Sequence, residues 1–501
     1  MCFKLCYIIL PIMLEKLTID KEEGEGDEDG TTCLIENGTG RQTDTLGIIK
    51  ERVLKMEKTQ KLKRTLTLFQ VVFLGLAWMT PMIFFTSFGI LFEASKGMLT
   101  AAYMLAFIAI FFTASSYGKM AKAFPVSGSA LTYITKAMNP FVGFLVGWAI
   151  LLDYFFSCII AVLMFGINLH AQFPSIPTYV WIIVLDIVIM IINIIGVKSS
   201  ANVSRVFVIM QIIFIAIFCS TVLNHLLRTG SATTVSSLSS PFIMNSHVTF
   251  SNILAGASIV CFSFLGFDSI TTMAEETINP KKNIPRAIMI IIVIAAVLYF
   301  TTSYLIQLAY PHFTFQNPDS AGFELAKTVG GNLISSLFTF VLIFAILTQG
   351  VSSMTTVSRL LYVMGRNALL PKKSFGYVHP KFKTPVFNIV IVSILSLLAL
   401  VIDLDTCIKF VNFGALVAFM FVNLSVIAHY FIKEKQRSLQ QFISYLLFPL
   451  IGAGFIFYLL TLLDKWSLLL GSAWLVIGFV YLAIIIKKPY EQEGKEKKAV
   501  I

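Results

Sequence analysis

The chain has 501 residues, of which 57% are hydrophobic and only 13% carry a charge. This composition excludes an ordinary soluble domain and indicates a protein that spans a membrane. The net charge of +11 does not indicate a nucleic-acid partner, because the positive residues gather in alternate loops between apolar segments. None of the seven cysteines forms a CxxC pair, so we expect neither a disulfide framework nor a zinc site.

Residues 1–60 differ from the rest of the chain. They contain an acidic, glycine-rich run at 21–30, which is typical of disorder. We interpret residues 1–60 as a disordered cytoplasmic extension. This extension could be a regulatory tail or a dispensable addition, and we favour the second interpretation. Translation could then also start at Met56.

Apolar segments of about 20 residues, enough to cross the hydrocarbon core of a bilayer, recur after residue 67. We predict twelve of them, at 68–92, 98–122, 140–166, 178–196, 200–224, 251–275, 284–309, 332–358, 385–403, 406–432, 442–463 and 467–487. Basic residues concentrate in the loops that follow even-numbered segments. This asymmetry predicts that both termini lie in the cytoplasm.

Two of these segments are interrupted near their middle. The first contains Gly75 and Pro81, and a proline removes a helix hydrogen bond and clashes with the preceding turn. The sixth is interrupted at Ser263–Asp268. A charge at the bilayer centre costs about 2.5–3.5 kcal/mol on insertion scales, so we expect Asp268 to face a cavity or a partner. Interruptions at corresponding places in two halves predict an inverted repeat with a binding site between the halves.

Two more carboxylates lie within apolar segments. Asp153 is close to the centre of the third segment, and Asp186 lies at similar depth in the fourth. Each is a candidate cation ligand, proton carrier or carboxylate bonded to a neighbouring helix. The aromatic neighbours Trp148 and Tyr154 favour a functional role for Asp153 over one for Asp186. The six histidines lack ligand spacing, so no metal site is expected.

Several stretches resemble a known family. They are Ser116–Tyr133, Val142–Tyr154, Gly256–Asp268, Gly266–Ile288, Val357–Asn367, Phe375–Pro385 and Asn412–Val426. With the interrupted first segment and the loop charges, they resemble the amino acid–polyamine–organocation transporter superfamily, and more closely the bacterial proton-coupled putrescine importers. The resemblance covers most of residues 60–490.

This resemblance implies an all-α polytopic membrane protein with alternating access. It implies twelve transmembrane helices in a domain of residues 61–490, with repeat one at about 68–224 and an inverted repeat two at about 251–432. Helices 1 and 6 would be broken, two peripheral helices would lie at about 442–487, and residues 491–501 would form a cytoplasmic tail. The residues expected to bind the solute are Trp78, Met79, Thr80, Asp153, Ser263, Phe264, Leu265 and Asp268, and those expected at a gate or in coupling are Glu275, Glu276 and Arg286.

The sequence departs from the superfamily in two places. Amino-acid carriers typically have a G-x-G-like run in the first break, whose N–H groups bind the substrate carboxylate. This chain has Ala77–Pro81 there, a poor cradle for a carboxylate. Some proton-coupled relatives carry a lysine in the fifth segment where this chain has Gln211, so the coupling mechanism is left open.

These observations predict an importer of putrescine or a similar small diamine, driven by the proton gradient or the membrane potential. Asp268 and Asp153 would neutralise ammonium groups, Trp78 and Phe264 would offer aromatic faces, and Glu275 and Glu276 would pair with nearby cations at a gate. The alternatives are a proton-coupled amino-acid permease or exchanger and a solute sensor acting through the first fifty residues. No nucleophile–base pair, metal motif or phosphate loop indicates an enzyme or a cofactor. The expected partners are the solute, protons and the lipid bilayer, in the inner membrane of a bacterium.

Overall fold

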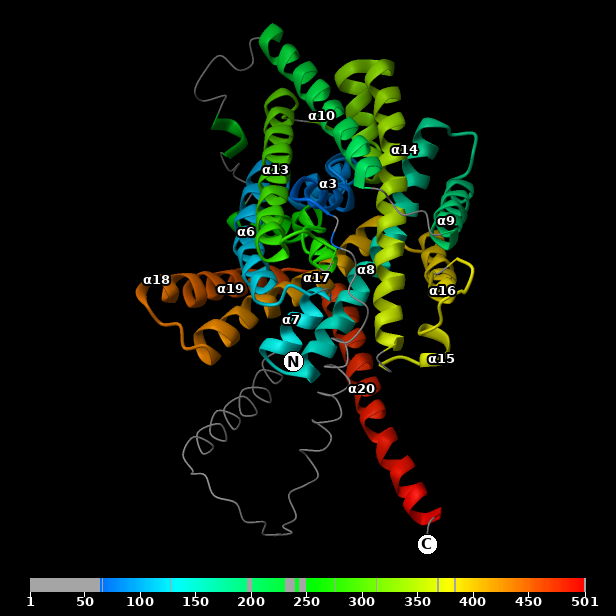
Figure 1. The fold of residues 1–501 in the computed structure, drawn as a ribbon. Coiled ribbons are helices and arrows are strands. Elements are labelled where there is room, and N and C mark those ends of the chain that lie inside the picture. The colour runs from blue at the N-terminus through cyan, green and yellow to red at the C-terminus, as the bar shows by residue number, and fades with distance from the viewer. Residues whose placement is uncertain are drawn as a thin grey trace. The chain divides into compact units, whose positions relative to one another are not determined.

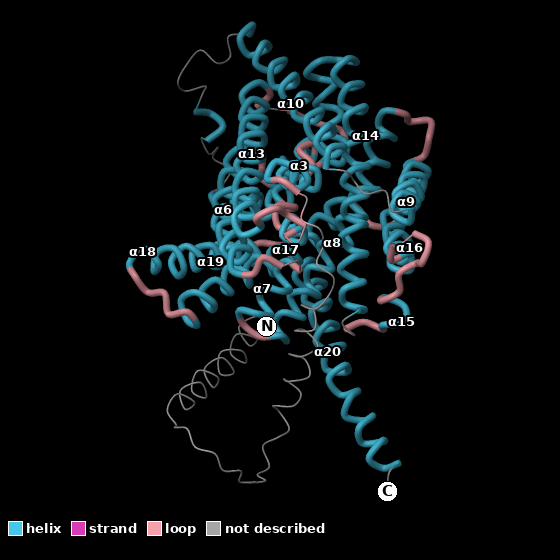
Figure 2. The backbone as a smooth tube through the Cα atoms, viewed as in Figure 1, coloured by secondary structure: helices cyan, strands magenta, loops and turns pink. Residues whose placement is uncertain are grey.

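Helices make up nearly all of the described structure (Figures 1 and 2). The structure is a computed structural model, and it describes residues 64–499 apart from residues 65, 127, 196–200, 230–238, 243–248, 275, 312, 367–368 and 383. The predicted extension at 1–60 and the gate candidate Glu275 therefore lie outside the described residues. Everything described belongs to the compact unit Ile49–Ile501.

The first half of the described chain supplies five crossings. The first is divided into α3 (Leu68–Met79), α4 (Ile83–Thr86) and α5 (Phe88–Ala94). The next four are α6 (Leu99–Ala123), α8 (Pro140–Gln172), α9 (Thr178–Ile195) and α10 (Ala201–Thr229), and the short α7 (Ser129–Ala137) joins α6 to α8.

The second half repeats this plan. Its first crossing is divided into α12 (Phe250–Val260) and the 3₁₀ helices η3 (Cys261–Phe264) and η4 (Ser269–Met273). The others are α13 (Pro280–Ala309), α14 (Ala321–Arg366, preceded by η5, Pro318–Ser320), α16 (Val386–Ser396, continued by η6, Leu397–Leu400) and α17 (Leu404–Val426, continued by the π-helix η7, Ile427–Lys433). The short α15 (Lys372–Phe375) lies between α14 and α16.

Two further crossings complete the described chain. One is α18 (Leu439–Phe442), η8 (Ile443–Leu447) and α19 (Phe448–Thr461), and the other is α20 (Lys465–Ala499). Eleven described helices are long and apolar enough to cross a membrane, and the shorter apolar helix Val386–Leu400 lies at the ninth predicted segment. The twelve predicted segments are thus confirmed as helices, and the chain is a multi-pass α-helical membrane protein.

Local sequence explains where several crossings begin. Asn139 accepts a hydrogen bond from the Phe141 N–H at 2.9 Å and is followed by proline at the first helical position, which fixes the start of α8. Asp403 accepts from the Thr406 N–H at 3.0 Å at the start of α17. Within α14, Gly330 and Gly331 leave helical geometry, so this crossing is kinked.

Corresponding helices of the two halves pack on one another. The second crossing α6 packs on α13, the third crossing α8 on α14, and the fourth crossing α9 on α16. The divided crossings also meet, because α3 contacts η4, and Figure 1 shows α3 in the middle of the view between α13 and α14, which it also contacts. This pairing of equivalent helices agrees with the predicted inverted five-plus-five repeat. The predicted all-α polytopic fold is confirmed.

Candidate functional site

The break in the first crossing leaves few backbone N–H groups without a hydrogen-bond acceptor. Thr80 adopts a left-handed φ of 52°, its N–H donates to the Leu76 carbonyl at 2.8 Å, and its hydroxyl donates to the Ala77 carbonyl at 2.9 Å. The N–H of Met82, which follows Pro81, donates to Oε1 of Gln211 on α10 at 3.2 Å. Since Pro81 has no N–H, the donors that this break exposes are already taken.

The break in the sixth crossing lies directly against the first. Gly266 has a φ of 116°, which an L-residue with a side chain rarely adopts. A Cβ at this position would lie 2.3 Å from Cδ1 of Trp78 and 2.9 Å from the Met79 backbone nitrogen. The backbone of Gly266 in the sixth crossing therefore packs directly against Trp78 and Met79 of the first crossing, and only a residue without a side chain permits this contact.

Asp268 bonds to a backbone donor of the sixth break. Its Oδ1 accepts a hydrogen bond from the Gly266 N–H at 3.3 Å, and the Ser269 N–H donates to the Gly266 carbonyl at 3.3 Å. The hydroxyl of Tyr154 on α8 donates to Oδ2 at 3.4 Å. The side chain is 4% exposed. An acidic residue of this chain thus bonds to the Gly266 N–H and places a negative charge at the break, where it disfavours an external anion.

Asp153 lies beside Asp268 without a neutralising cation. It is 5% exposed, and its Oδ1 accepts from the Ser157 hydroxyl at 3.3 Å. Gly414 of α17 packs against its backbone, and the two carboxylates are near enough to interact electrostatically. No Lys or Arg among the described residues forms an ion pair with either one. Two acidic groups in a buried, uncompensated position favour a proton or an external cation between them.

The predicted solute-binding residues fall into two groups. Trp78 belongs with the carboxylates, because its ring meets Tyr154 edge to face at a centroid distance of 5.8 Å. Phe264 is fully buried and points into a different cluster, with Tyr299 at 5.5 Å and Tyr103 at 6.1 Å. Ser263 joins this second cluster through a 3.1 Å hydrogen bond with Tyr103. Among the described ring contacts, Phe264 packs with this second cluster, whereas Trp78 packs with Tyr154.

The remaining predicted binding residues are part of the breaks. Met79 and Leu265 are both buried, and Met79 lies against Gly266 through its backbone. The Thr80 hydroxyl donates to the Ala77 carbonyl within the same crossing. These three residues thus shape the backbone beside Asp268.

The sequence does not predict the contact of Tyr154 with Asp268. The pattern marks Tyr154 as an aromatic neighbour of Asp153, whereas its hydroxyl donates to Asp268, 114 positions along the chain. The sequence likewise does not predict the bond of Gln211 to Met82, which links positions 129 apart. No local pattern identifies either contact, because each depends on how distant helices pack.

The gate candidates are arranged differently from the expectation. Glu276 is half-buried and Arg286 is exposed, and Glu276 forms no ion pair with Lys281, Lys282 or Arg286 among the described residues. A backbone link is present instead. The Leu66 N–H donates to the Glu276 carbonyl at 3.0 Å, and the Ile278 N–H donates to the Leu66 carbonyl at 2.9 Å, so the chain before the first crossing is tied to the end of the sixth.

Asp186 is held by a neighbouring helix. The hydroxyl of Ser393 on α16 donates to its Oδ2 at 2.5 Å, and the side chain is 2% exposed. Of the three roles open to this carboxylate, the structure supports the bond between helices. It joins α9 to α16 outside the two breaks.

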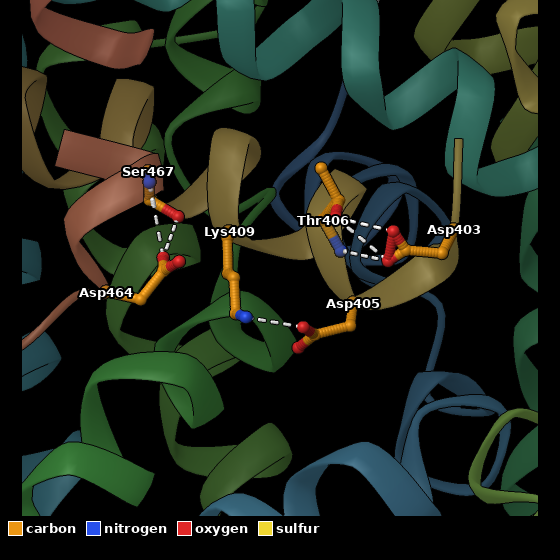
Figure 3. Close-up of polar contacts among 6 residues, drawn as sticks. All are labelled: Asp403, Asp405, Thr406, Lys409, Asp464 and Ser467. Carbon is orange, nitrogen blue, oxygen red and sulfur yellow. Dashed lines mark hydrogen bonds and ion pairs between the residues drawn. The ribbon is translucent and has the colours of Figure 1, made fainter. Parts of the chain in front are cut away.

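The two ends of the crossings differ in charge. At one end, which we call the acidic side, Asp403 bonds to Thr406, Asp405 pairs with Lys409, and Asp464 bonds to Ser467 (Figure 3). Asp319 of η5 interacts electrostatically with the negative charges of Asp403, Asp405 and Glu93. At the opposite end, the basic side, Lys119 donates to the Ser444 carbonyl at 2.6 Å. This separation agrees with the alternating loop charges of the sequence.

A surface hollow of about 480 Å³ lies away from the carboxylates. It is lined by the end of α8, the start of α9 and η6, including Leu163, His170 and Tyr179. Its lining holds no acidic residue, so it does not compete with Asp153 and Asp268 as a cation site. No group of three or more His, Cys, Asp or Glu side chains within the described part of the chain could hold a metal ion.

Comparison with known proteins shows the family of this chain. The model of the amino acid permease family matches residues 70–492. The chain is 40% identical over 429 residues to the low-affinity putrescine importer PlaP of Escherichia coli (strain K12), which covers 85% of this chain and 94% of that protein. It is 26% identical over 468 residues to the branched-chain amino acid permease BcaP of Bacillus subtilis (strain 168), covering 88% and 97%.

A third relative is the methylthioribose transporter of Bacillus subtilis (strain 168), 27% identical over 463 residues and covering 87% of this chain and 96% of that protein. These relatives carry different solutes on one scaffold, so the shared family does not choose among solutes. The matched region contains both helix breaks and both central carboxylates. The chain therefore belongs to the amino acid permease family.

Proposed function

We propose that this protein is a secondary transporter that imports putrescine or a similar small diamine by alternating access. The solute binds at the two helix breaks, where Asp268 and Asp153 receive its ammonium groups and Trp78 offers an aromatic face. Both carboxylates are buried, so the protein has to open toward each side in turn before a solute can enter or leave. The putrescine importer among the relatives supports this choice of solute.

The occupation of the break N–H groups carries the proposal. In the first break the Thr80 and Met82 N–H groups are bound by Leu76 and Gln211, and in the sixth the Gly266 N–H is bound by Asp268. A substrate carboxylate would have to displace a charged side chain of the protein. A diamine has no carboxylate and meets two buried acidic groups, so its charges complement the site.

Dication entry can be driven by the membrane potential as well as by protons. A potential of 100 mV supplies about 2.3 kcal/mol for each charge moved across the membrane. We propose proton coupling as the second contribution, with Asp153 or Asp268 taking a proton when the solute leaves. In the proposed orientation the basic side and both termini face the cytoplasm of a bacterium, across its inner membrane.

An amino-acid permease or exchanger is the alternative, and the family membership and the branched-chain amino acid permease among the relatives support it. The two functions differ in whether a carboxylate is needed for binding. Competition by amino acids against a labelled diamine separates them.

The deciding experiment is uptake of labelled putrescine into proteoliposomes under an imposed proton gradient, then under an imposed potential alone. We expect saturable uptake that unlabelled diamines block and simple amino acids do not. Accumulation of a neutral amino acid without uptake of putrescine would overturn the proposal. A membrane without the protein corrects for passive entry of the uncharged amine.

A further inference from the structure

Tyr117 places a buried hydroxyl close to the two carboxylates. The residue lies on α6 and is fully buried. Its ring meets Phe267 of the sixth break edge to face at 5.4 Å, and it meets Phe419 of α17 in the same way at 5.7 Å. Tyr133 of α7 packs on it at 6.2 Å. Three elements therefore fix the ring, and the direction of the hydroxyl is set by their packing.

Among the described residues, the hydroxyl of Tyr117 has no hydrogen-bond partner, in contrast to that of Tyr154. Its ring packs on Phe267, the residue before Asp268, and the hydroxyl lies within electrostatic reach of Asp268 and Asp153. Neither an ion pair nor a hydrogen bond explains its position, and burial of a polar group without a partner is unfavourable. A hydroxyl held by packed rings within electrostatic reach of two acidic groups is suited to a partner that arrives from outside.

We propose that the Tyr117 hydroxyl oxygen is a third acceptor for one ammonium group of the solute, beside Asp153 and Asp268, an inference that rests on the proposed diamine function. A primary ammonium has three N–H donors. The three acceptors come from the second, third and sixth crossings, so one ammonium connects three separate helices. The site then selects primary amines over amines whose nitrogen carries methyl groups in place of N–H donors.

The test compares two tyrosine-to-phenylalanine variants, Tyr117→Phe and Tyr299→Phe. Tyr299 is also fully buried, and its hydroxyl has no partner within the described part of the chain, but its ring lies with Tyr103 and Phe84 in the other aromatic cluster. Equilibrium binding of labelled putrescine is measured on the purified full-length protein, with thermal unfolding as a check on folding. We expect Tyr117→Phe to raise the Kd about tenfold or more, as for a lost hydrogen bond to a charged group, and Tyr299→Phe to leave it within about twofold.

A second ligand tests the donor count. Putrescine dimethylated on both nitrogens keeps one N–H on each nitrogen, and it is measured as a competitor in the same assay. If Tyr117 accepts an N–H, methylation weakens binding to the wild type more than binding to Tyr117→Phe. This difference depends on hydrogen bonding and is not expected from a purely structural role of the ring.

The outcomes separate this inference from the proposed function. Wild-type protein that binds putrescine, with Tyr117→Phe binding equally well and losing as much from methylation, would overturn the role of Tyr117 and leave the diamine function standing. Wild-type protein that binds no putrescine would overturn both. A folded Tyr117→Phe with weakened binding and a reduced methylation effect supports both.

Discussion

The hydroxyl of Tyr154 donates a hydrogen bond to Oδ2 of Asp268 at 3.4 Å, joining the third crossing to the break of the sixth. The same tyrosine packs edge to face on Trp78 of the first crossing. One side chain thus orients the acidic group and the aromatic face that are proposed to bind the solute. Substitutions around this contact give the sharpest tests of the site.

Asp268→Asn removes the charge and keeps a side chain of nearly the same shape. We expect the KM for putrescine uptake to rise about ten- to hundredfold, as for a lost hydrogen bond to a charged partner. Uptake kinetics in proteoliposomes measure this change. Asp186→Asn is the matched control, since Asp186 is a buried acidic residue bonded to Ser393 outside the breaks. Equal KM values for Asp268→Asn and the wild type would exclude Asp268 from the site.

Tyr154→Phe tests positioning separately from charge. The carboxylate keeps its hydrogen bond from the Gly266 N–H, so we expect a smaller rise in KM, about two- to tenfold, as for the net loss of one hydrogen bond. A double-mutant cycle with Asp268→Asn measures whether the two side chains are coupled. If the two residues act through their contact, the double variant is no worse than Asp268→Asn alone, whereas independent roles would make the effects additive.

Gly266→Ala should abolish transport by separating the two breaks. A Cβ there would lie 2.3 Å from Cδ1 of Trp78, and the φ of 116° is unfavourable for alanine. Gly454→Ala on α19 is the control, because a Cβ at that position meets no atom within 4 Å. Thermal unfolding and uptake are measured for both variants. Normal uptake by Gly266→Ala would mean that the two breaks do not need this close contact.

Gln211→Met should lower thermal stability. The change leaves the buried Met82 N–H without its acceptor, at a cost of about 1–3 kcal/mol, while the side-chain volume is nearly kept. Gln211→Glu retains an acceptor oxygen and is the matched comparison. Unfolding in detergent, followed by tryptophan fluorescence, compares the three proteins. A Gln211→Met variant as stable as the wild type would show that the Met82 N–H finds another acceptor.

Trp474→Phe tests whether the last crossing supports stability without contributing to binding. The indole N–H of Trp474 donates to the Trp148 carbonyl at 2.8 Å, that of Trp148 donates to the Trp474 carbonyl at 3.0 Å, and the rings stack at 5.0 Å. We expect a loss of about 1 kcal/mol in stability, as for one hydrogen bond, with an unchanged KM for uptake. Trp466→Phe, at a 71% exposed position of the same helix, should change neither quantity.

The sequence by itself determined the membrane class, the twelve crossings and the two breaks. Each follows from local chemistry: a run of about 20 apolar residues can span a bilayer, Pro81 cannot continue a helix hydrogen bond, and Asp268 is costly in a uniform membrane helix. Asp153 and Asp268 could be selected in the same way. The poor carboxylate cradle at Ala77–Pro81 followed from the resemblance to amino-acid carriers, whose first break typically has a G-x-G-like run.

Tertiary structure alone decided which of these side chains meet. It directed Phe264 toward Tyr299 and Tyr103, bonded Asp186 to Ser393, and brought Tyr154 and Tyr117 to the carboxylates. It also tied Leu66 to the chain after Glu276 by backbone hydrogen bonds, which no side-chain pattern encodes. The physical reason is that apolar periodicity states which face of a helix is buried, whereas the partner on that face depends on the rotation and depth of a helix that lies far away in the sequence.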